Sequence, residues 1–233
     1  MSSKSKSVIA ALVLASMPCL ASAHGARVQV GGLQDHVTFG GGTANMSGAS
    51  LGITGVSHRL GGIGIRARFG YADGFGASLE TLGVRVVGSP RRRISPYMSL
   101  GVLDLSSLAV PPMVSYVFNT TTFTQSTVTT NPPPVGVVMG DVFAGLRGRY
   151  VINPRLSLMA HVAMGEGIGG SVTGLAPQAN TGSVLATSFG VGARYRVTNR
   201  LNAGVSYTQE SIPARGSTFK NDGIEARVSY LFN

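Results

Sequence analysis

The apolar residues of this chain are spread by alternation and are not gathered into long runs. Mean hydropathy is positive, at +0.24. After residue 23, however, no stretch approaches the roughly 18 consecutive apolar residues that mark a membrane-spanning helix. In a lipid bilayer only helices and closed β-barrels pair every backbone N–H and C=O group. A hydrophobic chain without such helices therefore predicts an all-β fold, a closed antiparallel transmembrane β-barrel.

The N-terminus has the three parts of a secretory signal peptide. Lys4 and Lys6 precede an apolar run from Val8 to Leu14, and Ala21-Ser22-Ala23 forms a small-x-small cleavage site. The alternative, a retained membrane anchor, needs roughly 20 apolar residues, and this run is too short. We therefore predict a signal peptide over 1–23 and an exported barrel over 24–233.

The exported part contains no cysteine, because Cys19 lies within the predicted signal peptide. This excludes disulfides, thiol catalysis and cysteine-ligated metals there. Basic residues outnumber acidic ones, 19 to 9, which favours a nucleic acid or an anionic lipid as a partner. No basic helix or aromatic RNA-binding signature accompanies the charge. Export therefore leaves outer-membrane lipid and lipopolysaccharide as predicted partners, with no nucleic acid.

The clearest alternation runs from Leu185 to Val197. Apolar residues such as Phe189 and Tyr195 occupy odd positions, with Thr187 the one exception, and from Ser188 on glycine, serine and arginine occupy even ones. Moving the register by one residue turns Arg194 and Arg196 toward lipid, at roughly 2 to 4 kcal/mol each near the bilayer midplane. The apolar set is therefore predicted to face lipid, and the polar set to face the lumen.

The same period of two recurs along the rest of the chain. It is clear over 63–71, 138–150 and 156–164, and weaker over 79–87, 97–105 and 201–209. Nine strands are predicted between Ala49 and Phe232. A tenth is predicted within 27–40, where Gly31 and Gly32 interrupt the pattern. Ten strands is the preferred count, and eight is the alternative if two of the weak segments are loop.

Short connections alternate with long ones, which is typical of outer-membrane barrels with tight periplasmic turns and longer surface loops. The predicted short turns are 59–62, 89–95, 152–154 and 198–200. The predicted surface loops are 72–76, 106–134, 166–181 and 210–222.

The last strand alternates into an aromatic finish at Tyr230 and Phe232. Together with the strand, tight turn and strand over 190–201, it resembles small outer-membrane barrels of the OmpA-like and OmpX-like superfamily. The resemblance implies a multi-pass location in the outer membrane of a Gram-negative cell. It also implies insertion by periplasmic chaperones and the barrel assembly machinery, with Tyr230 and Phe232 as the signal. Asn233 displaces the usual terminal aromatic residue, and no peptidoglycan-binding domain is expected.

The lumen of so small a barrel is predicted to be filled mostly by side chains. Its arginines are expected toward the periplasmic end, and its carboxylates nearer the surface. They form either a structural ion-pair network or, if water passes, an anion-preferring path. The predicted lumen-lining residues are Arg66, Arg68, Arg85, Asp141, Arg147, Arg149, His161, Arg194, Arg196, Glu225 and Arg227.

Enzymes of the outer membrane are a rival class, and they need a base and its partner at the rim or lipid face. His161 is the only histidine on a clear strand, facing inward beside Arg147 and Gly145. A satisfied interior histidine explains it better than catalysis does. His24, His36 and His58 are scattered and show no metal-ligand spacing. No catalytic residue, metal or cofactor is predicted.

The segment 106–134 is the most unusual part of the sequence, with prolines at each end and a threonine-rich centre. It predicts either a solvated variable loop or a protruding hairpin whose edges pair with other chains. The preferred function is a non-enzymatic role in surface interaction or envelope structure, with an extracellular ligand at the loops. A narrow anion-preferring pore is the second alternative, and a lipid-modifying enzyme or protease is the third.

Overall fold

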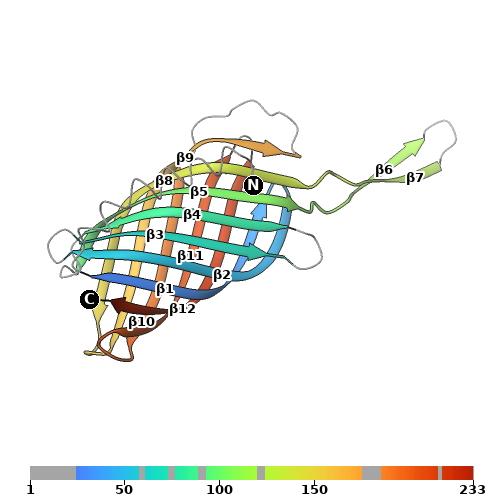
Figure 1. Ribbon diagram of the computed structural model, residues 1–233. Helices are drawn as coiled ribbons and strands as arrows, with labels where there is room; N and C mark the ends of the chain where they lie inside the picture. Colours follow the sequence, from blue (N-terminus) through green and yellow to red (C-terminus); the bar gives the residue numbers. More distant parts are fainter. Residues whose placement is uncertain are drawn as a thin grey trace.

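The computed structural model describes residues 25–57, 61–72, 77–88, 93–119, 124–174, 185–214 and 217–232. Ten antiparallel strands form a closed barrel in the order β1-β12-β11-β10-β9-β8-β5-β4-β3-β2, and β6 and β7 form a separate two-stranded sheet (Figure 1). The strands are β1 (Ala26–Phe39), β2 (Gly42–Ser57), β3 (Gly61–Tyr71), β4 (Ser78–Val87), β5 (Ile94–Leu108), β6 (Met113–Asn119), β7 (Thr124–Thr130), β8 (Val135–Val151), β9 (Leu156–Thr173), β10 (Ala186–Arg196), β11 (Leu201–Ala214) and β12 (Ser217–Phe232). The predicted barrel and its count of ten strands are confirmed.

No helix within the described ranges is both long and apolar enough to cross a bilayer. The predicted signal peptide, 1–23, lies outside the described residues and stays a prediction.

The barrel closes where the first strand meets the last. β1 pairs with β12 from Ala26↔Phe232 to Thr38↔Lys220, and it pairs with β2 on its other side. The strand predicted within 27–40 is therefore present. Gly40 and Gly41 have φ of 57° and 85°, which glycine adopts without steric cost, and they form the tight turn into β2. Because of that turn β2 begins at Gly42, so the predicted start of the second strand at Ala49 was wrong.

Several strands continue past their predicted ends toward the surface. β9 reaches Thr173, and β11 pairs with β12 without a break as far as Ala214↔Ser217. The predicted loops 166–181 and 210–222 were therefore drawn too long. The reason is that outward residues on these extensions, such as Ser211 and Lys220, are polar. Hydrophobic alternation stops there, but backbone pairing does not.

We call the end of the barrel that carries the β8–β9 and β10–β11 turns the periplasmic end; the opposite end, from which the β6–β7 hairpin projects, is the surface end (Figure 1). In the β8–β9 turn the side chain of Asn153 accepts hydrogen bonds from the backbone N–H groups of Arg155 and Leu156, at 2.9 and 2.7 Å. In the β10–β11 turn the hydroxyl of Thr198 accepts one from Leu201, at 3.0 Å. These side chains stabilise the two turns predicted at 152–154 and 198–200. Residues 58–60, 73–76 and 89–92 of the other predicted connections lie outside the described ranges.

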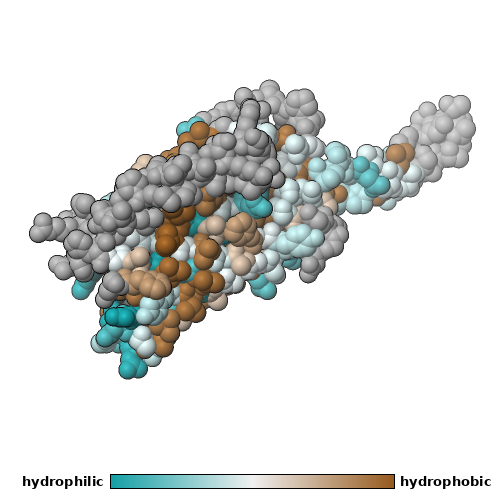
Figure 2. All heavy atoms as spheres, in the orientation of Figure 1, coloured by the Kyte–Doolittle hydropathy of each residue, from teal (hydrophilic) through white to brown (hydrophobic). Residues whose placement is uncertain are grey.

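The outer face of the barrel carries an apolar band, visible as brown side chains in Figure 2. On β10, Phe189 is 45% exposed while its neighbour Ser188 is 2% exposed, so the predicted inward and outward sets are confirmed. On four strands the first outward polar residue toward the surface end is a carboxylate: Glu80, Asp104, Glu166 and Asp222. The apolar band ends at these residues, so we expect lipid headgroups at this level.

The surface half of the lumen is filled by an apolar layer that the sequence analysis did not predict. Its largest fully buried side chains come from seven strands around the barrel: Val37, Phe39, Met46, Leu79, Leu105, Leu108, Val135, Val137, Ile212 and Phe219. Facing side chains of this size pack together and exclude water. The polar part of the lumen therefore lies below this layer, toward the periplasmic end.

Candidate functional site

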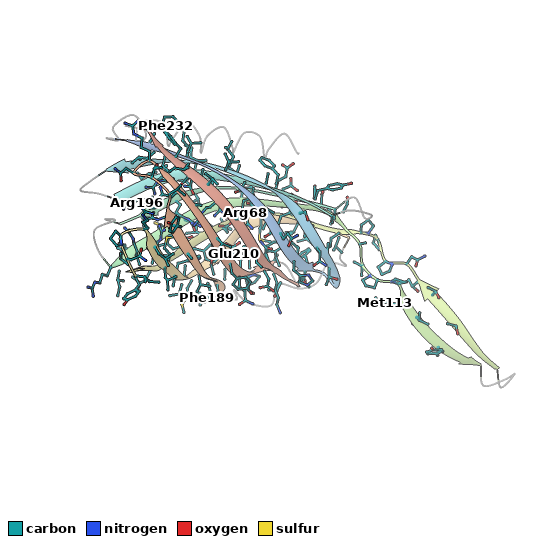
Figure 3. The ribbon with its side chains drawn as sticks, turned by 90° about the horizontal axis from the view of Figure 1, so that it is seen from below. Arg68, Met113, Phe189, Arg196, Glu210 and Phe232 are labelled. Carbon is teal, nitrogen blue, oxygen red and sulfur yellow. The ribbon has the colours of Figure 1, made fainter. Side chains whose placement is uncertain are left out.

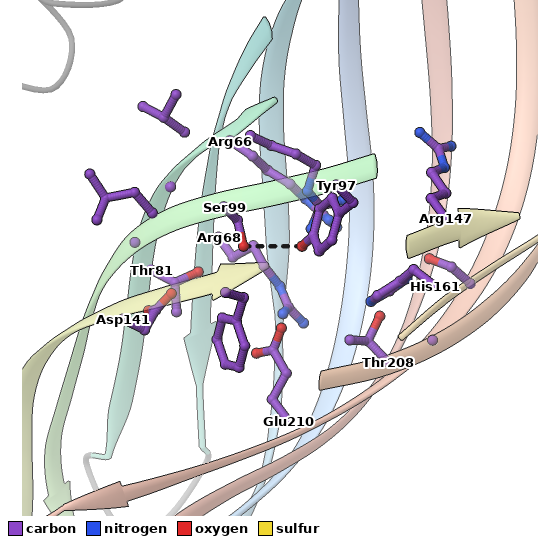
Figure 4. A pocket seen from close by; sticks show the side chains of 18 of the residues that line it. Arg66, Arg68, Thr81, Tyr97, Ser99, Asp141, Arg147, His161, Thr208 and Glu210 are labelled. Carbon is purple, nitrogen blue, oxygen red and sulfur yellow. Dashed lines mark hydrogen bonds between the residues drawn. The ribbon is translucent and has the colours of Figure 1, made fainter. Parts of the chain in front are cut away.

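The polar lumen contains a cavity of about 130 Å³. Alternation along β3, β4, β8, β9 and β12 points the cavity-lining side chains inward from different sides of the barrel. Figure 4 shows Arg66 and Tyr97 near one another, with Arg147 and His161 on a different side from Asp141. Of the predicted lumen residues, those that line this cavity are Arg66, Arg68, Arg85, Asp141, Arg147, His161 and Arg227.

The remaining predicted lumen residues lie elsewhere. Arg149, Arg194 and Arg196 lie at the periplasmic end, around a small recess of about 10 Å³ beside the β8–β9 turn. Figure 3 shows Arg196 at the end of the barrel opposite Met113. Glu225 is buried on β12, where its carboxylate takes part in an ion pair. The lumen is thus most basic at its periplasmic end.

Glu225 is the acceptor of one ion cluster. Arg66 of β3 forms an ion pair with it, and Arg227 lies 3.8 Å from the same carboxylate. The hydroxyl of Ser50 donates to it at 2.5 Å. A buried carboxylate with several donors and countercharges is stable in a low-dielectric interior, whereas an unpaired one is costly.

A second ion pair joins Arg68 and Asp35. The guanidinium of Arg68 donates to Asp35 at 2.6 Å, and the Asp35 side chain is almost fully buried. Asp35 was missed in the sequence because Gly31 and Gly32 obscure the pattern of its strand. Its place between Leu33 and Val37, at the same parity, is the signal that could have identified it as inward-facing.

Glu210, Tyr97 and Arg27 are further inward residues that sequence reasoning missed. Glu210 falls in a segment assigned to a loop, yet it lies on β11 and lines the cavity. The ring of Tyr97 lies beneath the Arg85 guanidinium, 5.0 Å from the ring centroid, in a cation–π contact. Arg27 lies near the start of β1, where its buried Nε has no hydrogen-bond partner.

His161 occupies an interior position without a carboxylate partner. It is the register neighbour of Arg147, as predicted, and of Gly190. Its ring lies 5.5 Å from that of Tyr97, and its Nε2 is 3.4 Å from the Ser188 hydroxyl. The Nδ1 atom of His36 forms a hydrogen bond with the Oδ1 atom of Asn45, at 2.7 Å. Among the described residues no histidine forms an ion pair with a carboxylate, and no three potential metal ligands come together.

The β6–β7 hairpin is the other candidate site. Its strands pair only with each other, from Met113↔Thr130 to Asn119↔Thr124. Figures 1 and 3 show the hairpin projecting well beyond the surface end of the barrel. Met113, Val114, Tyr116 and Val128 are exposed. The predicted protruding hairpin within 106–134 is therefore present, with β5 ending before it at Leu108.

A closed barrel with an apolar outer band, polar extensions at one end and short turns at the other is the architecture of an integral outer-membrane protein. The family model of the outer membrane protein beta-barrel domain matches residues 7–232. The chain belongs to this family and lies in the outer membrane as a multi-strand barrel. The comparison with curated proteins found no match.

Solved barrels resemble the chain only distantly. The translocator domain of autotransporter NalP from Neisseria meningitidis is 13% identical, with a TM-score of 0.47 and 97% of each chain covered. Outer membrane protease OmpT from Escherichia coli is 12% identical, with a TM-score of 0.46, 91% of this chain and 98% of that chain covered. Ail, the attachment invasion locus protein of Yersinia pestis, solved with the heparin analogue sucrose octasulfate, is 13% identical, with a TM-score of 0.35, 89% of this chain and 99% of that chain covered.

Proposed function

We propose that this outer-membrane barrel is a non-enzymatic surface-interaction protein, and that its β6–β7 hairpin binds an extracellular protein by pairing with an extended strand of the partner. The observation that carries the proposal is the hairpin itself. It is a separate two-stranded sheet, so each strand keeps one edge unpaired within the described part of the chain. Unpaired edges offer rows of backbone N–H and C=O groups to a third strand.

The hairpin offers a partner exposed apolar side chains in addition to its unpaired backbone edges. Tyr116 is 70% exposed, and Met113 and Val114 are more than half exposed. Isolated two-stranded hairpins are marginally stable in water, because they bury little apolar surface. A partner strand laid along the hairpin covers these side chains and stabilises the sheet.

Proline-rich segments hold the hairpin away from the barrel. Pro111 and Pro112 precede β6, and Pro132 to Pro134 follow β7. Proline fixes φ and cannot donate a backbone hydrogen bond, so these segments are stiff and do not join the barrel sheet. The hairpin is therefore presented beyond the membrane surface, where a protein outside the cell can reach it.

The alternatives have less support. A narrow anion-preferring pore needs a continuous polar path, and the apolar layer around Phe39 and Phe219 lies across the surface half of the lumen. An enzyme needs a converged base and partner. His161 lies beside Ser188, Tyr97 and Arg147, and among the described residues it forms no ion pair with a carboxylate. An envelope-structural role through lipid and lipopolysaccharide fits the apolar band, and it needs no hairpin.

The test compares cells that carry the wild-type barrel with cells that carry a chain lacking 115–132. We expect the deletion to reduce adherence to surfaces coated with extracellular proteins, at equal barrel level in the outer membrane. Tyr116→Ser should also reduce adherence, whereas Thr127→Ser, at its cross-strand partner, should leave it unchanged. Equal adherence of the deletion and wild-type cells would contradict the proposal and favour the envelope-structural role.

A further inference from the structure

The cavity in the polar lumen has an unbalanced basic side. Arg85, Arg147 and Arg227 line it from β4, β8 and β12, together with His161. The wall around it is a closed sheet, which separates the cavity from the surrounding lipid. The apolar layer separates it from the surface end. Any ligand of this cavity is therefore small and water-soluble, and it is not a lipid headgroup.

Two of these arginines lack a countercharge. Glu225 and Asp35 are taken by Arg66, Arg68 and, at 3.8 Å, Arg227. Among the described residues, neither Arg85 nor Arg147 forms an ion pair. Arg85 lies over the Tyr97 ring, and the one hydrogen bond that Arg147 donates to a described side chain goes to the sulfur of Met159, at 2.9 Å. Thioether sulfur is a weak acceptor, so most guanidinium donors on this side are free to bind a ligand.

The arginines also repel one another. Arg85 acts on both Arg147 and Arg227 through like-charge repulsion. Among the described residues, the carboxylates that line the cavity, Asp141 and Glu210, form no ion pair with Arg85, Arg147 or Arg227. Asp141 lies on a different side of the cavity from Arg147 in Figure 4. Like charges buried together without a counterion are unfavourable.

We infer that the basic side of this cavity binds one small tetrahedral oxyanion, of the charge and size of inorganic phosphate or sulfate, between Arg85 and Arg147. Guanidinium groups form paired hydrogen bonds with such oxyanions. The volume is sufficient, because one water molecule needs about 10–15 Å³ of such space and the cavity measures about 130 Å³. The hydroxyls of Ser99 and Thr208 line the same cavity and can donate further hydrogen bonds to the anion. This site is independent of the hairpin and of its proposed partner.

The experiment is equilibrium dialysis of the folded barrel in detergent micelles against radiolabelled inorganic phosphate, in excess sodium chloride to suppress weak surface binding. We expect saturable binding of one phosphate per barrel, and unlabelled sulfate should compete for it. Arg147→Met should weaken binding by about tenfold or more, since it removes charge-assisted hydrogen bonds. The matched control is Arg200→Met, because Arg200 is exposed in the β10–β11 turn; it should bind as the wild type does.

The decisive comparison needs only the wild-type barrel. No saturable binding to it overturns the inference, as does equal binding by heat-unfolded protein. Equal weakening by Arg147→Met and Arg200→Met also overturns it, because the phosphate then senses overall charge. If Arg147→Met does not fold, Arg85→Met is compared with Arg200→Met and interpreted by the same criteria.

Discussion

Arg66 of β3 and Glu225 of β12 form an ion pair across the lumen, although β1 and β2 lie between their strands in the barrel wall. Ser50 of β2 donates to the same carboxylate. The interior polar groups therefore join strands that do not pair directly. The backbone hydrogen bonds of the barrel wall hold each strand only to its two neighbours. Contacts between more distant strands therefore also constrain the cross-section of the barrel.

Removing the shared carboxylate should strongly destabilise the barrel. Glu225→Ala leaves Arg66 and Arg227 buried without a countercharge, and breaking a buried pair from one side costs about 3–5 kcal/mol. The measurement is the free energy of unfolding in urea, with the barrel in lipid vesicles. Glu166→Ala, at an exposed outward carboxylate on β9, is the control and should change it little. A loss as small as that of the control would mean that the cluster contributes no stability.

A pair of aspartate substitutions on β9 tests which side chains face lipid. Val162 is outward and 52% exposed, whereas Ser157 is inward and next to Arg194 in the register. Val162→Asp should lower the free energy of unfolding by up to about 2 kcal/mol, because a carboxylate then enters lipid. Ser157→Asp should be neutral or stabilising. The same urea titration measures both, and equal losses would contradict the assignment of faces.

How much of this fold could be predicted depends on where lipid acts on the chain. Alternation is strict where one face meets lipid, as over 185–197, and there the strands and their faces were predicted. Above the apolar band the inward residues become apolar, and on β4 and β5 the outward residues become polar. Val137 is inward and Val138 follows it directly, so β8 is apolar on both faces there. That run is the signal for the apolar layer, but hydrophobic periodicity alone does not distinguish a short buried strand from a buried helical segment.

The inward positions of the arginines were predictable from the same alternation, but their partners were not. Arg68 meets Asp35 only after β1 has paired with β2, and Arg66 meets Glu225 only after β1 has also closed against β12. These contacts depend on the long-range register of the whole barrel. A single sequence carries no direct record of that register, so the excess of arginine around the cavity became apparent only from the structure.

The apolar layer should contribute to stability more than the lipid-facing aromatic residues do. Phe219 is 0% exposed, and Phe219→Ala should lower the free energy of unfolding by about 3–5 kcal/mol because it leaves an internal void. Phe189→Ala, on the lipid-facing side of β10, should cost less, because lipid chains fill the space. Urea unfolding in vesicles compares the two variants. A larger loss for Phe189→Ala would contradict the packing of this layer.

The same layer should keep the barrel from conducting ions. Folded wild-type protein in a planar bilayer should show no discrete conductance steps, because the surface half of the lumen is filled by side chains. Deleting 115–132 should not change this result, since the hairpin lies outside the barrel. Anion-selective steps that decrease when Arg147 and Arg194 are neutralised would instead favour the pore.

The aromatic end of β12 should matter more for assembly in cells than for stability. Tyr230 and Phe232 both face outward near the periplasmic end, with their rings 4.8 Å apart and nearly perpendicular. Phe232→Ser removes the outermost aromatic side chain of the proposed insertion signal, while the ladder of β12 with β1 and β11 persists. We expect less folded protein in the outer membrane, measured by its heat-dependent mobility in gels.

The control is Ile224→Ser on the same face of β12, which should accumulate closer to the wild-type level. Refolding in vesicles without cellular factors should differ little between the two variants. If Phe232→Ser is as defective in vesicles as in cells, its ring acts through the stability of the barrel and not through recognition by the assembly machinery.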